Sequence, residues 1–211
     1  MKTLFQKVEM ENKYMSNYFI GDMHFGHKNA LAFDSRPFKT IEEHDAALIE
    51  NHNKVVGLTD DIWYLGDFSW HNATKTLEIL DQLNGTKHLI VGNHDGRLLK
   101  NRDIQKRFAE ITDYKELDIG NGKCLVLCHY PIPCFRNHFY GWIHFYAHVH
   151  SSFEENMILR CRYEMEELYD KSCEMYNIGA MMPWMDYAPR MINEIIDGWH
   201  ENHKEFKRKG E

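Results

Sequence analysis

The chain has 211 residues, of which 43% are hydrophobic and 27% are charged, proportions typical of a globular protein with one sizeable core. Its net charge of −7 argues against a protein whose affinity comes mainly from phosphate backbones, although bound metal ions would reverse the charge locally. No stretch approaches the ~18 apolar residues of a membrane span, and no apolar run of signal-peptide length opens the chain. We therefore expect a cytoplasmic protein without membrane contact.

The cysteines also favour a cytoplasmic protein. There are five, an odd number, and no Cys-x-x-Cys occurs, so reduced thiols are the default interpretation. No internal repeat, low-complexity segment or Gly/Ser linker divides the chain, which predicts a single domain over residues 1–211. Residues 1–16 could be an N-terminal extension, with Met15 as an alternative start.

Apolar runs and segments of helical spacing alternate along the chain. In chain order we expect strand 18–21, helix 42–56, strand 61–65, helix 74–83, strand 87–91, helix 97–109, strands 114–119 and 123–128, strand 142–146, helix 154–173, strand 174–178 and helix 191–206. The turn at residues 120–122 predicts that strands 114–119 and 123–128 form a hairpin. The alternation is typical of an α/β fold, in which ligands bind beyond the carboxyl ends of strands.

Five of the apolar runs end in ionisable or amide side chains. These are Asp22 and His24, Asp67, Asn93 and His94, His129, and His148 and His150. A dinuclear metal site needs several nitrogen or oxygen ligands for each ion and one carboxylate between the ions. The mixture of Asp, His and Asn suits borderline ions better than Ca²⁺. We expect two divalent metal ions, with manganese first and iron, zinc, nickel or magnesium as alternatives.

The order of these motifs is specific. They are Gly21-Asp22-Met23-His24, Gly66-Asp67, Gly92-Asn93-His94-Asp95, His129 and His148-Val149-His150. Over residues 18–150 the series resembles the calcineurin-like metallophosphoesterase superfamily. The segments Arg36-Pro37-Phe38 and Asn177-Ile178-Gly179 resemble its small, single-domain bacterial and phage branch. The resemblance implies a four-layer α/β/β/α sandwich, in which two mixed β-sheets are flanked by helices.

The resemblance also implies a role for each motif residue. It assigns the first metal to Asp22, His24 and His150, and the second metal to Asn93, His129 and His148. It implies that Asp67 bridges the two metals, that His94 is the general acid, and that Asp95 orients the His94 ring. A metal-bridging hydroxide would attack phosphorus in line with the leaving group.

The expected activity is that of a metal-dependent phosphoric ester hydrolase. We expect a phosphodiester or a small nucleotide-like phosphate as substrate, with diesters ahead of monoesters. The segment Gly66-Asp67-Phe68-Ser69-Trp70 lacks the Arg found in the Ser/Thr protein phosphatases of the superfamily, which disfavours a phosphoprotein substrate. Two alternatives stay open. A nuclease acting on DNA or RNA is disfavoured by the acidic net charge, and a non-catalytic metal-binding scaffold is disfavoured because His94 is present.

Three further residues are candidates for substrate binding. His27 could line the cleft or cap the helix that follows it. Arg36 and Arg97 could each pair with phosphate, with a surface salt bridge as the alternative for each. Trp70 and His71 could form a wall of the cleft or pack as ordinary side chains.

Overall fold

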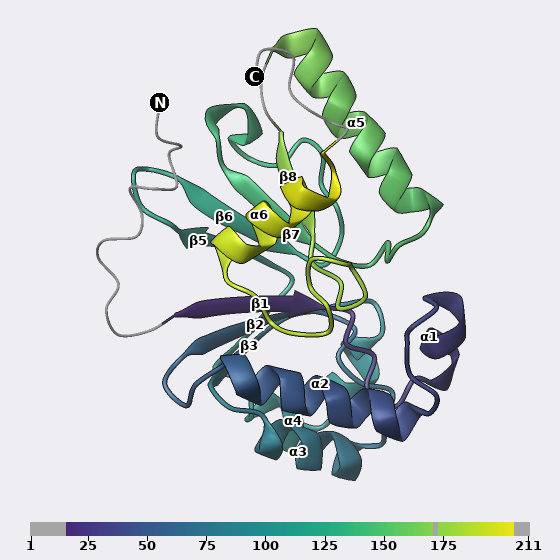
Figure 1. The fold of residues 1–211 in the computed structure, drawn as a ribbon. Helices are drawn as coiled ribbons and strands as arrows, with labels where there is room; N and C mark the ends of the chain where they lie inside the picture. Colours follow the sequence, from purple (N-terminus) through teal and green to yellow (C-terminus); the bar gives the residue numbers. More distant parts are fainter. Residues whose placement is uncertain (1–15, 171–172, 205–211) are drawn as a thin grey trace.

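The fold is built on two four-stranded sheets that face each other (Figure 1). The computed structural model describes residues 16–170 and 173–204, so the alternative start at Met15 falls outside the described residues. The strands of the first sheet are all parallel and lie in the order β1 (Asn17–Gly21), β2 (Asp61–Leu65), β3 (Thr86–Ile90) and β4 (Glu110–Thr112). The strands of the second sheet lie in the order β5 (Tyr114–Asp118), β6 (Cys124–Cys128), β7 (Ile143–Tyr146) and β8 (Glu174–Asn177). Only the β5–β6 pair, the predicted hairpin, is antiparallel among these strands.

Helices cover the outer sides of both sheets. Below the first sheet in Figure 1 lie α2 (Ile41–Val55), α3 (Ala73–Gln82) and α4 (Arg102–Gln105). On the other side, α5 (Phe153–Tyr169) and α6 (Ile192–Asn202) contact β8, and α6 also contacts β1. A short helix, α1 (Lys28–Phe33), follows β1. This arrangement is the four-layer α/β/β/α sandwich that the resemblance implied, except that only the second sheet is mixed and the first is parallel throughout.

Local sequence explains where the main elements begin and how the layers meet. The side chain of Thr40 accepts a hydrogen bond from the backbone N–H of Glu43 and caps α2, and Asn72 caps α3 in the same way. Between the sheets, the rings of Phe19 in β1 and Phe145 in β7 pack edge to face with centroids 5.3 Å apart. Burial of such apolar side chains on both sheets forms the core between the layers.

The strands and most helices lie where the sequence predicts them, with three differences. Residues 97–109 do not form one helix: a 3₁₀ helix, η2 (Asp95–Lys100), ends where Asn101 caps the four-residue α4 by accepting two backbone N–H groups. The predicted helix 154–173 ends at Tyr169, because Asp170 adopts a left-handed conformation. The short elements α1 and β4 were not predicted. Beyond residue 204, the end of the predicted helix 191–206 lies outside the described residues.

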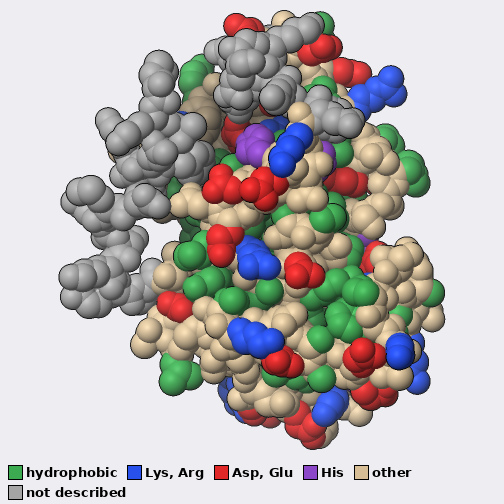
Figure 2. Space-filling view, viewed as in Figure 1, with side chains coloured by type: hydrophobic (Ala, Val, Ile, Leu, Met, Phe, Trp, Pro, Cys, Tyr) green, Lys and Arg blue, Asp and Glu red, His purple; other side chains and the backbone are tan. Residues whose placement is uncertain are grey.

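The described surface agrees with the composition. All five cysteines are free, and Cys128 and Cys173 are buried. No helix within residues 16–170 and 173–204 has both the length and the apolar character needed to cross a bilayer. On the face shown in Figure 2, and outside the residues drawn in grey, Lys and Arg side chains are interspersed with Asp and Glu and form no continuous basic track. That face therefore offers no evident path for a nucleic-acid backbone.

Candidate metal centre

The predicted ligands gather where strands of both sheets end. Asp22 and His24 follow β1, Asp67 follows β2, Asn93 follows β3, His129 follows β6, and His148 and His150 follow β7. Five of the seven have left-handed backbones with φ between 49° and 68°, namely Asp22, His24, Asp67, His148 and His150. Such conformations cost about 1–3 kcal/mol each for non-glycine residues and cluster at functional sites. The backbone is thus strained where the proposed ligands converge.

Asp22, His24 and His150 form the first cluster, with ligand atoms that lie within 4.8 Å of one another. Nε2 of His24 lies 3.8 Å from Oδ1 of Asp22, and Nε2 of His150 lies 3.9 Å from Oδ2 of Asp22. Asp22 Oδ1 and His24 Nε2 are buried and have no hydrogen-bond partner within the described structure. Buried polar atoms are rarely left unpartnered, because the loss of water costs free energy. These two atoms fit a divalent cation.

Asn93, His129 and His148 form the second cluster. Asn93 Oδ1 lies 3.0 Å from His129 Nε2 and 3.0 Å from His148 Nδ1. His129 donates through Nδ1 to the carbonyl oxygen of Leu65 at 2.7 Å, so in the neutral ring Nε2 carries a lone pair. That lone pair faces another acceptor, the Asn93 oxygen, and the arrangement becomes favourable when a cation lies close to both.

Asp67 lies between the two clusters. Its Oδ2 is 3.7 Å from Nε2 of His24, and its Oδ1 is 3.8 Å from Nε2 of His129. Asp22, Asp67 and His129 also have ligand atoms within 4.8 Å of one another. One carboxylate therefore turns one oxygen toward each cluster, which is the placement that a bridging ligand needs.

The ring nitrogens that point away from the first cluster have partners of their own. His24 Nδ1 lies 3.0 Å from Nδ1 of His27, and His150 Nδ1 donates to Oδ1 of Asp34 at 2.8 Å. These contacts leave Nε2 of both rings directed at the cluster. His27 does occupy the N-cap position of α1, as one of its two alternatives predicted, but its side chain makes no capping hydrogen bond. Its ring stacks instead on Trp70, with centroids 4.3 Å apart.

Burial and neighbouring groups shift the pKa values in the first cluster. Burial lowers the pKa of His24, and burial together with the charge of His24 lowers the pKa of His27 to about 4. Burial would raise the pKa of Asp22, but the nearby ring of His24 and the charge of His150 hold it well below its usual range. Burial would lower the pKa of His150, yet the hydrogen bond to Asp34 raises it. A metal ion would displace the second proton of a protonated His150 ring, because an imidazole that binds a metal must be neutral.

His94 lies on the open side of the centre. Its side chain is 51% exposed, and its Nε2 is 3.9 Å from Oδ2 of Asp67. The ring of Trp70 lies 4.5 Å from the ring of His94 and stacks on His24 at 4.4 Å. Trp70 therefore forms a wall between a proposed ligand and the proposed acid, which agrees with the first of its two predicted positions.

Asp95 differs from the role that the resemblance implied. Its Oδ1 accepts the backbone N–H of Phe68 at 2.9 Å, and its Oδ2 accepts those of Asp67 at 3.0 Å and Gly92 at 2.8 Å. Both oxygens are thus engaged with the backbone and not with the His94 ring. Asp95 joins the turn after β2 to the turn after β3 and so fixes the position of Asp67.

Arg36 is neither a phosphate contact nor a surface residue. Its side chain is 0% exposed and forms an ion pair with Asp34, with Nη2 2.7 Å from Oδ2. The predicted salt bridge is thus present, but it is buried and does not lie at the surface, and Arg36 faces His44 of α2. Sequence reasoning did not find Asp34, whose only signal is its place two residues before Arg36, where the segment that resembles the phage branch begins.

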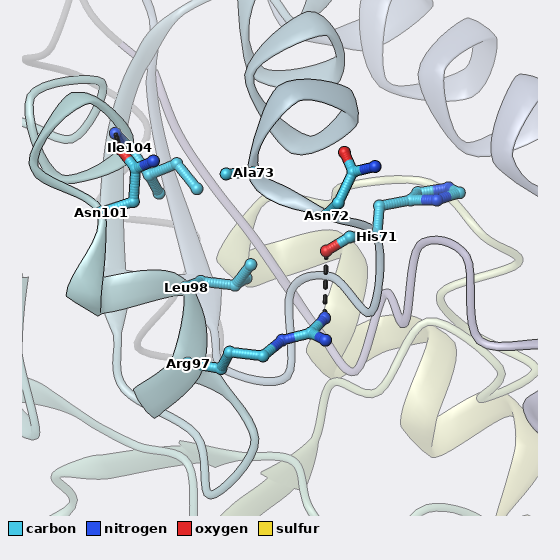
Figure 3. A pocket seen from close by; sticks show the side chains of 7 residues that line it. All are labelled: His71, Asn72, Ala73, Arg97, Leu98, Asn101 and Ile104. Carbon is cyan, nitrogen blue, oxygen red and sulfur yellow. Dashed lines mark hydrogen bonds between the residues drawn. The ribbon is translucent and has the colours of Figure 1, made fainter.

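Arg97 lies beside the metal centre and remains exposed. One of its terminal nitrogens donates to the carbonyl oxygens of Trp70 and His71, at 2.7 and 3.0 Å. It lines a pocket of about 250 Å³ together with Asn72, Leu98 and residues of α3 and α4 (Figure 3). None of the predicted metal ligands lines this pocket. Arg97 thus stabilises the turn after β2. In place of the predicted surface salt bridge, its guanidinium makes hydrogen bonds to backbone carbonyl oxygens.

Comparison with known proteins establishes the family. No family model matches the chain. The gene 66 protein of Mycobacterium phage D29 is 33% identical over 202 residues, which cover 89% of this chain and 91% of the phage protein. The chain belongs to the gene 66 protein family. An uncharacterized protein of Methanocaldococcus jannaschii is 35% identical over 140 residues, which cover 64% of this chain and 69% of that protein.

A solved structure shares the fold of this chain. A protein of unknown function from Aquifex aeolicus matches with a TM-score of 0.64 and 28% identity, over 87% of this chain and 98% of that one. Pseudomonas putida nuclease MPE is more distant, with a TM-score of 0.42 and 20% identity over 64% of this chain and 60% of that one. The last similarity is too weak to transfer an activity, so the function has to be argued from the site itself.

Proposed function

We propose that this gene 66 family member is a two-metal phosphoesterase of the calcineurin-like type, acting on a phosphodiester or a small nucleotide-like phosphate. The observation that carries the proposal is the position of Asp67, which turns one oxygen to each of the two ligand clusters. The first cluster also has two buried polar atoms without a hydrogen-bond partner in the described structure. Asp22, His24 and His150 would hold one ion, and Asn93, His129 and His148 would hold the other. Divalent ions held there, manganese first among them, supply Lewis acidity that activates water and neutralises phosphoryl charge.

The residues around the ions supply position and a proton. His94 is exposed on the open side, where its protonated ring can donate to the leaving oxygen as the bond between phosphorus and that oxygen breaks. Trp70 limits the directions that the His94 ring can take, because the two rings are in contact. The chain therefore provides a general acid that belongs to neither ligand cluster.

Exposed aromatic rings lie beside both clusters. Phe33 is 56% exposed, and its ring centroid lies 5.4 Å from that of His150. Tyr130 is 44% exposed, and its ring centroid lies 4.7 Å from that of His148. Flat apolar faces next to a phosphate site favour substrates that carry planar rings, as nucleotides do. This favours a nucleotide-like diester over a sugar or lipid phosphate.

The proposal is tested by hydrolysis of bis-p-nitrophenyl phosphate and p-nitrophenyl phosphate with added Mn²⁺. We expect turnover, faster for the diester, and a fall in kcat of about 10²–10⁴-fold in His94→Ala while bound metal is retained. His88→Ala is the matched control, since His88 lies in β3 and pairs with Asp61 at the opposite end of the strands from the ligands. No turnover of either ester by metal-loaded protein would contradict the proposal. Single- and double-stranded DNA and RNA then decide whether the diester is part of a polymer.

A further inference from the structure

Asp34 and Arg36 form a buried ion pair directly behind the first cluster. Nε and Nη2 of Arg36 lie 2.9 and 2.7 Å from Oδ2 of Asp34, and their side chains are 0% and 2% exposed. Ser35 between them has φ 52°, a left-handed turn that brings the two side chains to the same side. A strained non-glycine residue at a turn indicates a geometry that the surrounding structure enforces.

The second oxygen of Asp34 reaches the metal centre. Oδ1 accepts a hydrogen bond from Nδ1 of His150 at 2.8 Å. A carboxylate only accepts, so the proton of the neutral ring lies on Nδ1. The lone pair of His150 is then on Nε2, the atom turned toward Asp22. Asp34 thus sets both the tautomer and the orientation of a proposed ligand.

Arg36 links this carboxylate to the strained turn that carries the other ligands of the cluster. Its Nη2 donates to the carbonyl oxygen of Asp22 at 3.0 Å, and its Nη1 donates to that of Met23 at 3.1 Å. Nη1 also lies 2.9 Å from Nε2 of His44 in α2. With the two bonds to Asp34, these contacts engage all five N–H groups of the guanidinium. Arg36 therefore has no donor left for a substrate, and its role is to hold the first cluster in place.

Among residues 16–170 and 173–204, no charged pair supports the second cluster in a comparable way. His129 is oriented by a neutral carbonyl oxygen, and His148 turns Nδ1 itself toward Asn93. A carboxylate behind an imidazole makes the ring a more basic and better fixed ligand than a carbonyl does, and its loss typically weakens metal binding 10- to 100-fold. The ligand rings of the first cluster are therefore better oriented for an ion than those of the second cluster.

We propose that Asp34, held by Arg36, is the positioning residue of the first metal site, and that it makes this site the tighter of the two. This inference rests on the proposed function only in assigning metals to the two clusters. It extends the site beyond the predicted ligands to a residue that contacts neither substrate nor metal.

Titration calorimetry of the chelator-stripped full chain with Mn²⁺ tests the inference without any assay of activity. We expect two binding events in the wild-type protein, a tight one and a weaker one. In Asp34→Asn the tight event should weaken about 10- to 100-fold while the weaker event is unchanged. Asp81→Asn is the matched control, because Asp81 pairs with Arg107 on the surface and should titrate as the wild type does. Equal affinities in the wild type, or an unchanged titration of Asp34→Asn, would overturn the proposal.

A measurement on the wild-type protein covers the case in which Asp34→Asn does not fold. Two-dimensional ¹H–¹⁵N NMR of the histidine rings of the metal-free chain, with His150 assigned through His150→Gln, reports which ring nitrogen carries the proton. We expect the proton on Nδ1 of His150, and a proton on Nε2 alone would overturn the inference. Wild-type turnover with an unaltered Asp34→Asn titration would remove this inference alone. Two metal-binding events without turnover would remove the proposed function alone.

Discussion

Replacing Gly92 by alanine should damage the metal centre far more than the fold. Gly92 follows β3 and touches the turn that carries Asp67. A Cβ at this position would lie 2.5 Å from both the backbone N and Oδ1 of Asp67, whereas ordinary contact begins at 3.4 Å. One of the two turns must therefore move by about 0.9 Å. The backbone of Gly92 is not left-handed, so alanine brings no strain of its own and the clash is the whole perturbation.

The magnitudes separate stability from activity. Overpacking costs about 1–3 kcal/mol, and the lower entropy of the unfolded alanine chain offsets about 0.4–1 kcal/mol, so the free energy of unfolding should fall by at most about 2.6 kcal/mol. Misplacing the carboxylate between the clusters by ~1 Å should lower kcat about 100-fold. The assays are urea unfolding in EDTA and hydrolysis of bis-p-nitrophenyl phosphate with Mn²⁺.

Gly96→Ala provides the matched control. Gly96 lies four residues further on, in η2, and a Cβ there meets nothing within 4 Å. This variant should keep the wild-type kcat and gain up to about 1 kcal/mol of stability. The reasoning is refuted if Gly92→Ala keeps kcat within about twofold of the wild type, or if Gly96→Ala loses as much activity.

Two further predictions concern stability. Mn²⁺ at about 100 times the Kd of the tighter site should, through that site, add about 2.7 kcal/mol to the free energy of unfolding and raise Tm by about 5–10 °C over the EDTA-treated protein. Identical melting curves with Mn²⁺ and with EDTA would count against metal binding. Burial raises the pKa of Glu155 to about 7, against hydrogen bonds from Asn177 and Tyr146. The pKa of Glu155 is then higher in the folded than in the unfolded chain, so Glu155 contributes its full stabilisation below about pH 4.5, where it is protonated in both states. That contribution is lost as the pH rises through 7, and the free energy of unfolding falls by about 3 kcal/mol. Glu155→Gln should remove that loss between pH 5 and pH 8 in urea unfolding, and parallel pH profiles of the two proteins would show that Glu155 does not titrate there.

The sequence could predict the alternation of strands and helices and the gathering of the ligands because both depend on local features, whereas the two-sheet sandwich was implied only by the family resemblance. Asp67 and Asn93 each end a buried run that is followed by glycine, and the carboxyl ends of parallel strands meet at one edge of a sheet. The assignment of His148 and His150 to different clusters came only from the family resemblance. Their spacing of two residues would place both on one side of an extended segment, but each has a left-handed backbone that turns its ring to a separate cluster.

Features that depend on tertiary pairing could not be predicted. The hydrogen bond between Asp34 and His150 joins residues 116 positions apart, and no local sequence pattern around either residue predicts this pairing. From the sequence, Arg36 has the character of a surface or phosphate-binding arginine, but in the fold it is buried and contacts His44 of α2. Asp95 follows His94 directly, yet its oxygens are taken by backbone groups of neighbouring turns. In each case the sequence gives the residue type, and packing decides its partner.

Anomalous diffraction from crystals grown with Mn²⁺ tests the central claim most directly. We expect two manganese peaks, one on each side of the Asp67 carboxylate. The first should lie among Asp22, His24 and His150, and the second among Asn93, His129 and His148. A single peak that does not contact Asp67, or no peak at either cluster in protein that is otherwise intact, would contradict the claim that these residues form a two-metal centre.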